Sequence, residues 1–270
     1  MTNSGDSPNQ HLFAGTAWYY ARYRPGYPQA FFDDLIQRFN LNGTGRLLDL
    51  GCGSGQLTIP LARHVTEAIG VDPEPGMLTE ASNKAQTAQV TNVTWAQGSS
   101  TDLPGRLGQF RLVTMGRSFH WMDREQVLTA LASMVDDDGG IVIANDGCLV
   151  RPTTTWQHAV EDIQHRFLGP IPKIAPKNVI DTHTHEPHEM LLARSAFRKL
   201  DRVVHKFERT WTPEQIIGYL YSTSLPLRRL LGDQQTAFEQ AVTDTLHSLD
   251  QEGRFVEPVS LEVLIARKES

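Results

Sequence analysis

One stretch constrains the fold of this chain more than any other: Leu47-Leu48-Asp49-Leu50-Gly51-Cys52-Gly53-Ser54-Gly55. It begins as a short apolar run, which predicts a buried strand, and then places glycine on three alternate residues. The residues from 56 to 62 predict the start of a helix. A strand that enters a helix through such a turn presents backbone N–H groups to a ligand, because glycine has no Cβ to block the approach. The rest of the chain is expected to complete a ligand site around this turn.

The composition is that of an ordinary globular protein, with 270 residues, 40% hydrophobic and 21% charged. This length can bury a sizeable core and favours one α/β domain with an insertion. A net charge of −6 argues against a nucleic-acid surface. Two cysteines, Cys52 and Cys148, are too few for a disulfide framework. Neither a membrane-spanning run nor a signal core stands out. We expect a cytoplasmic monomer or homodimer that binds neither nucleic acid nor membranes.

Apolar runs alternate with helical patterns over the first half of the chain. Strands are expected at 46–50, 67–72, 90–97, 110–115 and 141–145, and helices at 29–39, 75–86 and 123–135. The acidic residues 136–140 are expected to form a solvated turn. This alternation predicts a Rossmann-like, seven-stranded, mostly parallel sheet with helices on both faces.

The regular alternation of predicted strands and helices ends after residue 149. Residues 150–195 hold scattered prolines and one convincing helix, 154–167, and are expected to form a cap over the carboxyl ends of the strands. Strands at 197–211 and 255–266 and helices from 212 and at 234–249 follow. The sequence thus predicts an N-terminal lid and first helix over residues 1–45 and a cofactor-binding core over 46–149. It predicts the inserted cap over 150–195 and the C-terminal part of the core sheet over 196–270.

Two cofactor classes fit a glycine turn of this kind. A dinucleotide site needs a further glycine where this chain has Gln56, and a pyrophosphate beside Asp49 would be repelled by about 1 kcal/mol or more. S-adenosylmethionine has no phosphate, and its methionine end carries an ammonium group that a carboxylate suits. Asp72 ends the second strand about 20 residues after Gly51, a spacing that suits contact with ribose hydroxyls. The sequence therefore favours S-adenosylmethionine.

The sequence resembles the class I S-adenosylmethionine-dependent methyltransferases. The glycine turn and Gly70-Val71-Asp72-Pro73-Glu74-Pro75-Gly76-Met77-Leu78 look like the first two motifs of that family. Tyr20-Ala21-Arg22-Tyr23-Arg24-Pro25-Gly26-Tyr27-Pro28 and Ser118-Phe119-His120-Trp121 are typical of its small-molecule branch, which includes trans-aconitate methyltransferase-like and many bacterial biosynthetic enzymes. The likeness covers about residues 15–145 and, more loosely, 195–267.

The resemblance implies a role for each matching position. The methionine end of the cofactor would be held by Asp49, Gly51 and Gly53, and the ribose by Asp72. Pro73 and Met77 would line the adenine, whose edge would meet Ser99 and Ser100. Met115, Gly116 and Arg117 would lie near the methyl group. Tyr20, Tyr23 and Arg24 would close over the cofactor carboxylate as a lid, although the tyrosines also suit simple helix packing. Many relatives have an acid where this chain has Ser99, so either Ser99 is a weaker acceptor or Asp102 swings in.

The acceptor side is less defined by the sequence. His120 follows the fourth strand, and a neutral imidazole there could take a proton from the acceptor, bind it, or only hydrogen-bond the backbone. Tyr19, Phe119 and Trp121 are the expected substrate contacts. The histidines His183, His185 and His188 lack a strong zinc spacing, so no metal is expected. Basic residues between 194 and 209 favour a solvated face or the rim of an anionic-substrate site.

Methyl transfer to a small, biosynthetic acceptor by in-line displacement is the favoured function. A cyclase or rearrangement enzyme that binds S-adenosylmethionine without transferring methyl is an alternative, as is a non-enzymatic cofactor-binding module. Formation of the product S-adenosylhomocysteine during turnover separates the first reading from the other two.

Overall fold

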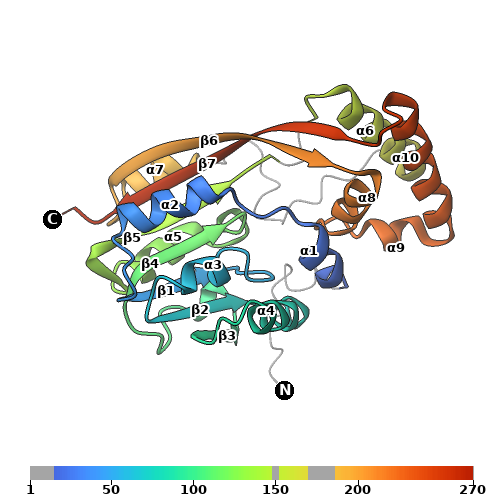
Figure 1. The fold of residues 1–270 in the computed structure, drawn as a ribbon. Helices are drawn as coiled ribbons and strands as arrows, with labels where there is room; N and C mark the ends of the chain where they lie inside the picture. The colour runs from blue at the N-terminus through green and yellow to red at the C-terminus, as the bar shows by residue number, and fades with distance from the viewer. Residues whose placement is uncertain (1–14, 148–151, 170–185, 270) are drawn as a thin grey trace, which may run out of the picture.

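The computed structural model describes residues 15–147, 152–169 and 186–269. These residues form a seven-stranded sheet with strand order β3-β2-β1-β4-β5-β7-β6 (Figure 1). The strands are β1 (Arg46–Leu50), β2 (Glu67–Asp72), β3 (Val93–Gln97), β4 (Phe110–Gly116), β5 (Val135–Asn145), β6 (Lys199–Trp211) and β7 (Phe255–Arg267). The first five strands are parallel, and β7 runs antiparallel between β5 and β6. The predicted Rossmann-like, mostly parallel sheet is confirmed.

Helices flank the sheet or lie beyond it, and most of them are where the sequence predicts. They are α1 (Ala17–Tyr23), α2 (Gln29–Arg38), α3 (Thr58–Ala62), α4 (Pro75–Thr87), α5 (Arg124–Leu131), α6 (Thr155–Leu168), α7 (His188–Ala193), α8 (Pro213–Tyr221), α9 (Leu227–Leu231) and α10 (Gln235–Leu249). Their starts follow local sequence rules. Helix α8 begins with a proline after Thr212, whose side chain accepts from Gln215 in a capping box. The described part of the chain contains no helix with the length and apolarity needed to span a membrane.

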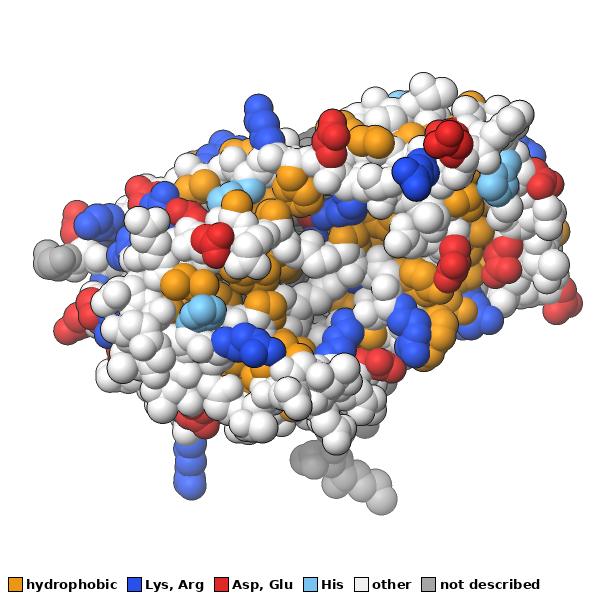
Figure 2. Space-filling view, in the orientation of Figure 1, with side chains coloured by type: hydrophobic (Ala, Val, Ile, Leu, Met, Phe, Trp, Pro, Cys, Tyr) orange, Lys and Arg blue, Asp and Glu red, His pale blue; other side chains and the backbone are white. Residues whose placement is uncertain are grey.

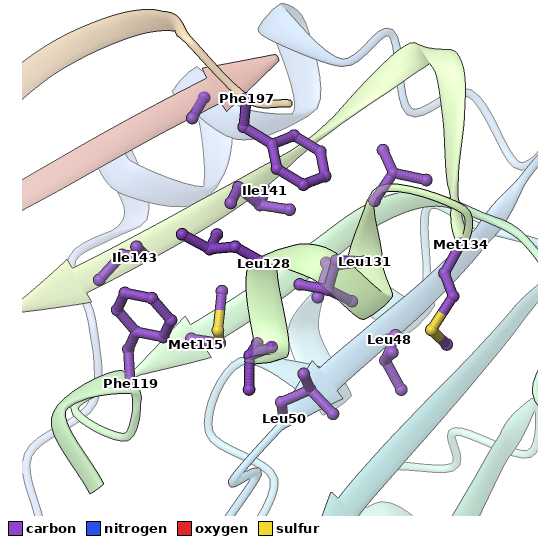
Figure 3. Packing of buried hydrophobic residues seen from close by; sticks show 14 of the residues in the cluster. Leu48, Leu50, Met115, Phe119, Leu128, Leu131, Met134, Ile141, Ile143 and Phe197 are labelled. Carbon is purple, nitrogen blue, oxygen red and sulfur yellow. The ribbon is translucent and has the colours of Figure 1, made fainter. Parts of the chain in front are cut away.

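Two apolar layers hold the helices onto the sheet. On one face, α2 and α3 pack Phe31, Leu35 and Leu61 against β1, β4, β5 and β7. On the other face, α5 and α7 pack against alternate residues of the same strands, and Figure 3 shows Leu128 and Leu131 of α5 lying over this surface. Strands buried on both faces read as continuous apolar runs, which is why β1, β4 and the end of β5 are visible in the sequence.

One local prediction differs from the structure, and two short helices are not predicted by the sequence. Residues 136–140 belong to β5 as an irregular stretch, because the β4–β5 register shifts between Phe110 and Leu112, rather than forming a separate turn. The short helices α7 and α9 are not predicted by the periodicity. Each is five or six residues long, too short to repeat a helical pattern that can be told from chance.

The helices α6, α8, α9 and α10 form a helical lobe beyond the sheet. Their apolar residues make a third core that includes Trp156, Trp211, Tyr219 and Phe238. Strands β6 and β7 extend from the sheet into this lobe (Figure 1). The lobe therefore combines α6, from the predicted cap, with α8–α10, which the sequence places with the C-terminal part of the sheet. Helix α7, also within the predicted cap, packs on the sheet instead. Helix α1 lies between the lobe and α4, in contact with α8 and α4.

The strand order reverses between β1 and β4. In open α/β sheets, ligands bind in the crevice at the carboxyl ends of the strands where the order reverses. The glycine turn follows β1, and the Ser118–Trp121 segment follows β4. Figure 2 shows this face of the molecule indented between the sheet and the helical lobe, with hydrophobic side chains gathered along the indentation.

Candidate functional site

The glycine turn at the end of β1 packs directly on the segment that follows β4. Gly51, Gly53 and Gly55 all have positive φ angles, of 69°, 52° and 78°. A Cβ on Gly51 would lie 2.5 Å from the Cβ of Ser118. Ser118 in turn donates a hydrogen bond of 2.6 Å to the carbonyl of Leu50. Glycine is therefore required at residue 51 by both its backbone angle and its neighbour.

Asp49 lies behind this turn, with 1% of its surface exposed. Its Oδ2 accepts a 2.5 Å hydrogen bond from the Thr58 hydroxyl and its Oδ1 a 2.8 Å hydrogen bond from the Thr114 hydroxyl. Burial raises the pKa of Asp49 to about 6, against the two threonine hydrogen bonds, which lower it. The carboxylate thus faces two neutral hydroxyls, and its negative charge is not neutralised by these partners.

Asp72, at the end of β2, joins the second strand to the same turn. Its Oδ2 accepts from the backbone N–H of Gly53 at 2.9 Å and its Oδ1 from the N–H of Glu74 at 3.0 Å. Each oxygen retains a second lone pair for a further donor. Of the two predicted acids, Asp72 is therefore hydrogen-bonded to the glycine turn, and Asp49 lies at the end of the strand that leads into it.

The edge after β3 carries an acid despite Ser99. Asp102 Oδ2 accepts from the Ser99 N–H at 2.7 Å and lies 3.2 Å from the position of a Cβ on Gly98. The capping box formed by Ser99 and Asp102 holds the carboxylate there. Of the two alternatives for this edge, Asp102 already occupies a place beside Gly98. Ser100 opens the following 3-10 turn, and Pro73 and Met77 flank the start of α4, with Met77 buried.

Helix α1 sets one aromatic ring against the glycine turn. The Tyr20 ring lies where a Cβ on Gly53 would approach it to 3.1 Å. Arg24 lies over the Tyr20 and Tyr219 rings and donates a 2.7 Å hydrogen bond to the Tyr219 hydroxyl. The Gln56 side chain donates to the carbonyl of Arg24. Gln56 therefore ties the glycine turn to the segment that covers it.

Tyr19 and Tyr23 face the helical lobe instead of the glycine turn. Tyr23 stacks on Tyr19, packs on Gly218 of α8 and donates to Glu214. Tyr19 contacts Tyr221 edge to face. Residues four apart share a helix face, so Tyr19 and Tyr23 point one way and Tyr20 another. The predicted lid role of Tyr23 over the cofactor thus differs from its position in the structure.

Two predicted ligand contacts lie in the apolar core. Met115 and Phe119 have no exposed surface, and Figure 3 shows the Phe119 ring beside Met115 and Ile143. Side chains on the same face of β4 and β5 point into the α5 layer, which explains this placement. Phe119 therefore anchors the Ser118–Trp121 turn in the core, and its predicted substrate contact differs from the structure.

His120 and Trp121 remain accessible at the end of that turn. Both are partly exposed, and their rings lie 4.9 Å apart. His188, on α7, contacts Phe119 edge to face, and its Nδ1 lies 3.0 Å from an Arg124 nitrogen. Since arginine only donates, this nitrogen accepts. His183 and His185 lie outside the described residues.

Buried charged side chains form a row beside the Ser118–Trp121 turn. The sequence does not predict this row. Arg117 has a left-handed backbone, with φ 55°, and binds Asp146 through two hydrogen bonds of 2.6 and 2.8 Å. Arg209 joins Asp146 to Glu257. Burial alone would raise the pKa of Asp146, but Arg117 and then Arg209 outweigh it and lower the pKa to about 2. The guanidinium of Arg117, which the resemblance places near the methyl group, is thus engaged by Asp146. Arg209 departs from the predicted solvated face, because β6 carries it into the lobe.

The comparisons with known proteins agree with this geometry. A family model described as a methyltransferase domain matches residues 47–139. An uncharacterized methyltransferase of Schizosaccharomyces pombe is 31% identical over 125 residues, which are 46% of this chain and 48% of that protein. Residues 47–139 of this chain are therefore similar to methyltransferase domains. The chain spans 42–48% of the length of several curated relatives that it matches.

Solved structures show the same fold over nearly the whole chain. A methyltransferase of Thiobacillus denitrificans in complex with S-adenosylhomocysteine is 18% identical, with a TM-score of 0.52 and coverage of 96% of this chain and 97% of that one. One of Geobacter sulfurreducens, also with S-adenosylhomocysteine, is 16% identical, with a TM-score of 0.51 and coverage of 96% and 98%. At these identities the likeness shows the fold of this chain alone.

Proposed function

We propose that this protein transfers the methyl group of S-adenosylmethionine to a small-molecule acceptor. The observation that carries the proposal is the glycine turn with a buried carboxylate, Asp49, directly behind it. The hydroxyls of Thr58 and Thr114 leave the charge of that carboxylate in place. A cationic ligand at the turn would supply the missing positive charge, whereas a pyrophosphate would be repelled.

The residues present fit this cofactor. In the turn, Gly51 and Gly53 pack on Ser118 and Tyr20, and their N–H groups already bond the Val71 carbonyl and the Asp72 carboxylate. The Asp72 carboxylate keeps lone pairs for ribose hydroxyls. When bound, S-adenosylmethionine supplies an electrophilic methyl group on a positively charged sulfur. The contribution of the protein is to align the acceptor with that methyl group and to exclude water. Tyr20, fixed over Gly53, and Arg24, fixed over Tyr20, cover the turn for this purpose.

The acceptor would bind between the Ser118–Trp121 turn, the N-terminal segment and the helical lobe. Tyr27 supports this reading, because a Cβ on Gly116 would lie 2.4 Å from its hydroxyl oxygen. Burial raises the pKa of Tyr27 above its usual range, so its phenol keeps its proton and offers a neutral hydrogen bond. A site enclosed by α1 and the lobe suits a small molecule better than a macromolecular surface.

His120 is the proposed base for acceptors that must lose a proton. It is partly exposed at the end of β4, and imidazole titrates near neutral pH. The variant His120→Asn keeps hydrogen bonding but cannot take a proton. We expect unchanged S-adenosylhomocysteine affinity and a rate reduced by a factor of about 10² to 10⁴. Unchanged turnover would leave His120 with a binding or structural role.

The turn is tested by calorimetric titration with S-adenosylhomocysteine. Gly51→Ala places a methyl group against Ser118, whereas Gly43→Ala, at a φ of 90°, has nothing within 4 Å of the new Cβ. Both variants have a strained left-handed alanine, so Gly43→Ala controls for backbone strain. We expect Gly43→Ala to bind as the unmodified protein does and Gly51→Ala to lose at least tenfold in affinity. Equal binding by both variants would remove the turn from the cofactor site.

The acceptor is sought by incubating the protein with a cell extract and radiolabelled methyl donor, and by identifying the labelled product by mass. A labelled small molecule, formed together with S-adenosylhomocysteine, supports the proposal. Cofactor binding with conversion of an acceptor but no S-adenosylhomocysteine would indicate a cyclase or rearrangement enzyme. Binding with no conversion would indicate a cofactor-binding module.

A further inference from the structure

Four charged side chains, two directly after β4 and β5 and two on β6 and β7, form one buried row between the turn after β4 and the helical lobe. The row runs from Arg117 to Asp146, Arg209 and Glu257. Arg209 donates to Asp146 at 3.0 Å and to Glu257 at 3.1 Å, which extends the paired hydrogen bonds between Arg117 and Asp146. The side chains of the two arginines are 11% exposed, and those of Asp146 and Glu257 are 1% and 5% exposed. Two positive and two negative charges balance within the row.

Each end of the row is attached to a different part of the molecule. At one end, Arg117 begins the turn that carries His120, and its Nη1 donates to the carbonyl of Pro25. At the other end, Glu257 accepts a 2.9 Å hydrogen bond from Trp211 Nε1 and a 3.2 Å hydrogen bond from Gln157 of α6. The row therefore links the turn after β4 and the N-terminal segment to the helical lobe.

Stability alone does not account for this arrangement. Buried ion pairs are often no more stabilising than apolar residues of the same volume, because removing the charges from water is costly. Arg117 also holds a left-handed backbone that non-glycine residues rarely adopt. Such strain persists where the surrounding contacts over-determine it, and it gathers at functional sites. Hydrogen bonds with fixed directions give the row a geometric specificity that apolar packing lacks.

We propose that this row of charges sets the position of the Arg117–Trp121 turn relative to the helical lobe, with Asp146 and Arg209 as positioning residues. The two walls of the acceptor side thereby keep one geometry. This step rests on the proposed function in taking the turn as the acceptor side. The cofactor side is held by Asp49, Asp72 and the glycine turn, which do not belong to the row.

Two variants separate charge balance from connection. Asp146→Asn leaves two guanidiniums against one carboxylate. The double variant Asp146→Asn with Arg209→Gln restores the balance but leaves the turn and the lobe unlinked. Asp138→Asn is the matched control, since Asp138 pairs with Arg111 near the start of the same strand and is largely exposed.

The readout is the set of tryptophan indole N–H signals in a nitrogen-15 NMR spectrum, assigned by single Trp→Phe variants. Trp121 reports the turn, Trp211 reports the lobe, and Trp95 on β3 serves as an internal reference. In both test variants we expect the Trp121 and Trp211 signals to move or broaden while that of Trp95 stays. Only the double variant should regain thermal stability. Affinity for S-adenosylhomocysteine should stay within about twofold of the unmodified protein. Once an acceptor is known, its KM should rise while the cofactor KM stays the same.

Some outcomes overturn the proposal. If the double variant recovers the Trp121 signal together with its stability, the row serves charge balance alone. An unmoved Trp121 signal in both test variants also contradicts the proposal, as does an equal effect of Asp138→Asn. If Asp146→Asn does not fold, the double variant decides. A protein that binds no S-adenosylhomocysteine would end the proposed function, but the tryptophan signals would still judge the link between turn and lobe.

Discussion

Asp49 and Asp146 lie at the carboxyl ends of β1 and β5 in the same sheet, and their surroundings shift the pKa of the two carboxyl groups in opposite directions. Asp49 is the next-to-last residue of β1, and Asp146 directly follows β5. The side chain of each is almost fully buried. The pKa of Asp49 is raised to about 6, whereas that of Asp146 is lowered to about 2. Similar burial therefore has different consequences for the charge.

The difference lies in the partners. Asp49 accepts hydrogen bonds from two neutral hydroxyls, which only partly replace the water that it loses. Asp146 is held between two guanidiniums, and opposite charges within hydrogen-bond distance favour its ionised form. The charge of Asp146 is thus neutralised inside the protein. That of Asp49 is not neutralised by its two hydroxyl partners, which fits the proposed contact with the cationic end of the cofactor.

The largest expected effect follows from removing each charge at pH 7. Asp146→Asn leaves an unpaired guanidinium in the interior, and we expect a loss of about 3–5 kcal/mol in the free energy of unfolding. Asp49→Asn removes a desolvated charge while keeping the shape, and we expect equal or greater stability. Urea denaturation of both variants measures the comparison. A comparable loss in both would mean that Asp49 is also paired in solution.

The second prediction concerns the pH dependence of stability. The folded-state pKa of Asp146 lies below its unfolded value, so its contribution is present above pH 4 and is lost as pH falls toward 2, by about 2 kcal/mol. The folded-state pKa of Asp49 lies above its unfolded value. Its penalty is therefore absent below about pH 4 and grows to about 3 kcal/mol as pH rises through 6.

These curves are separated by subtracting the stability of each Asn variant from that of the unmodified protein at each pH. For Asp146 the difference should shrink below pH 4, and for Asp49 it should change between pH 4 and 6. A difference curve for Asp49 that is flat over this interval would contradict its raised pKa.

The two carboxylates also differ in how far the sequence predicts them. Most of the surroundings of Asp49 are local, since the strand, the glycines and Thr58 fall within ten residues and Asp72 closes the next strand, whereas Thr114 comes from β4. The surroundings of Asp146 are assembled from β4, β6 and β7, and Arg209 pairs with Glu257 only because antiparallel strands bring them into register. A basic residue in a strand of mixed polarity, such as Arg209, is predicted to face the solvent. No periodicity in the sequence shows that β6 continues into the helical lobe. Likewise, the sequence places Phe119 after the fourth strand but does not show that its ring points into the core.

Ligand binding should titrate with Asp49 and not with Asp146. A cationic amino group at the turn favours ionised Asp49, so affinity for S-adenosylhomocysteine should fall about tenfold between pH 7.5 and pH 5. Calorimetric titration over this range, in two buffers with different ionisation enthalpies, should show proton release near pH 6. The variant Asp49→Asn should bind more weakly at pH 7.5 and show little dependence on pH. Affinity that is independent of pH in the unmodified protein would place the amino group away from Asp49.

The smallest effect isolates the two hydroxyls that hold Asp49. Thr58→Val and Thr114→Val each keep the side-chain shape and remove one hydrogen bond that lowers the pKa of Asp49. Each loss should raise the pKa, and the pH midpoint for ligand binding should rise by a fraction of a unit to about one unit, equivalent to about 0.5–1.5 kcal/mol. Thr129→Val is the matched control, because the Thr129 hydroxyl donates to the carbonyl of Glu125 on the same helix, α5. A midpoint that moves equally in all three variants would show that stability, and not the protonation of Asp49, governs binding.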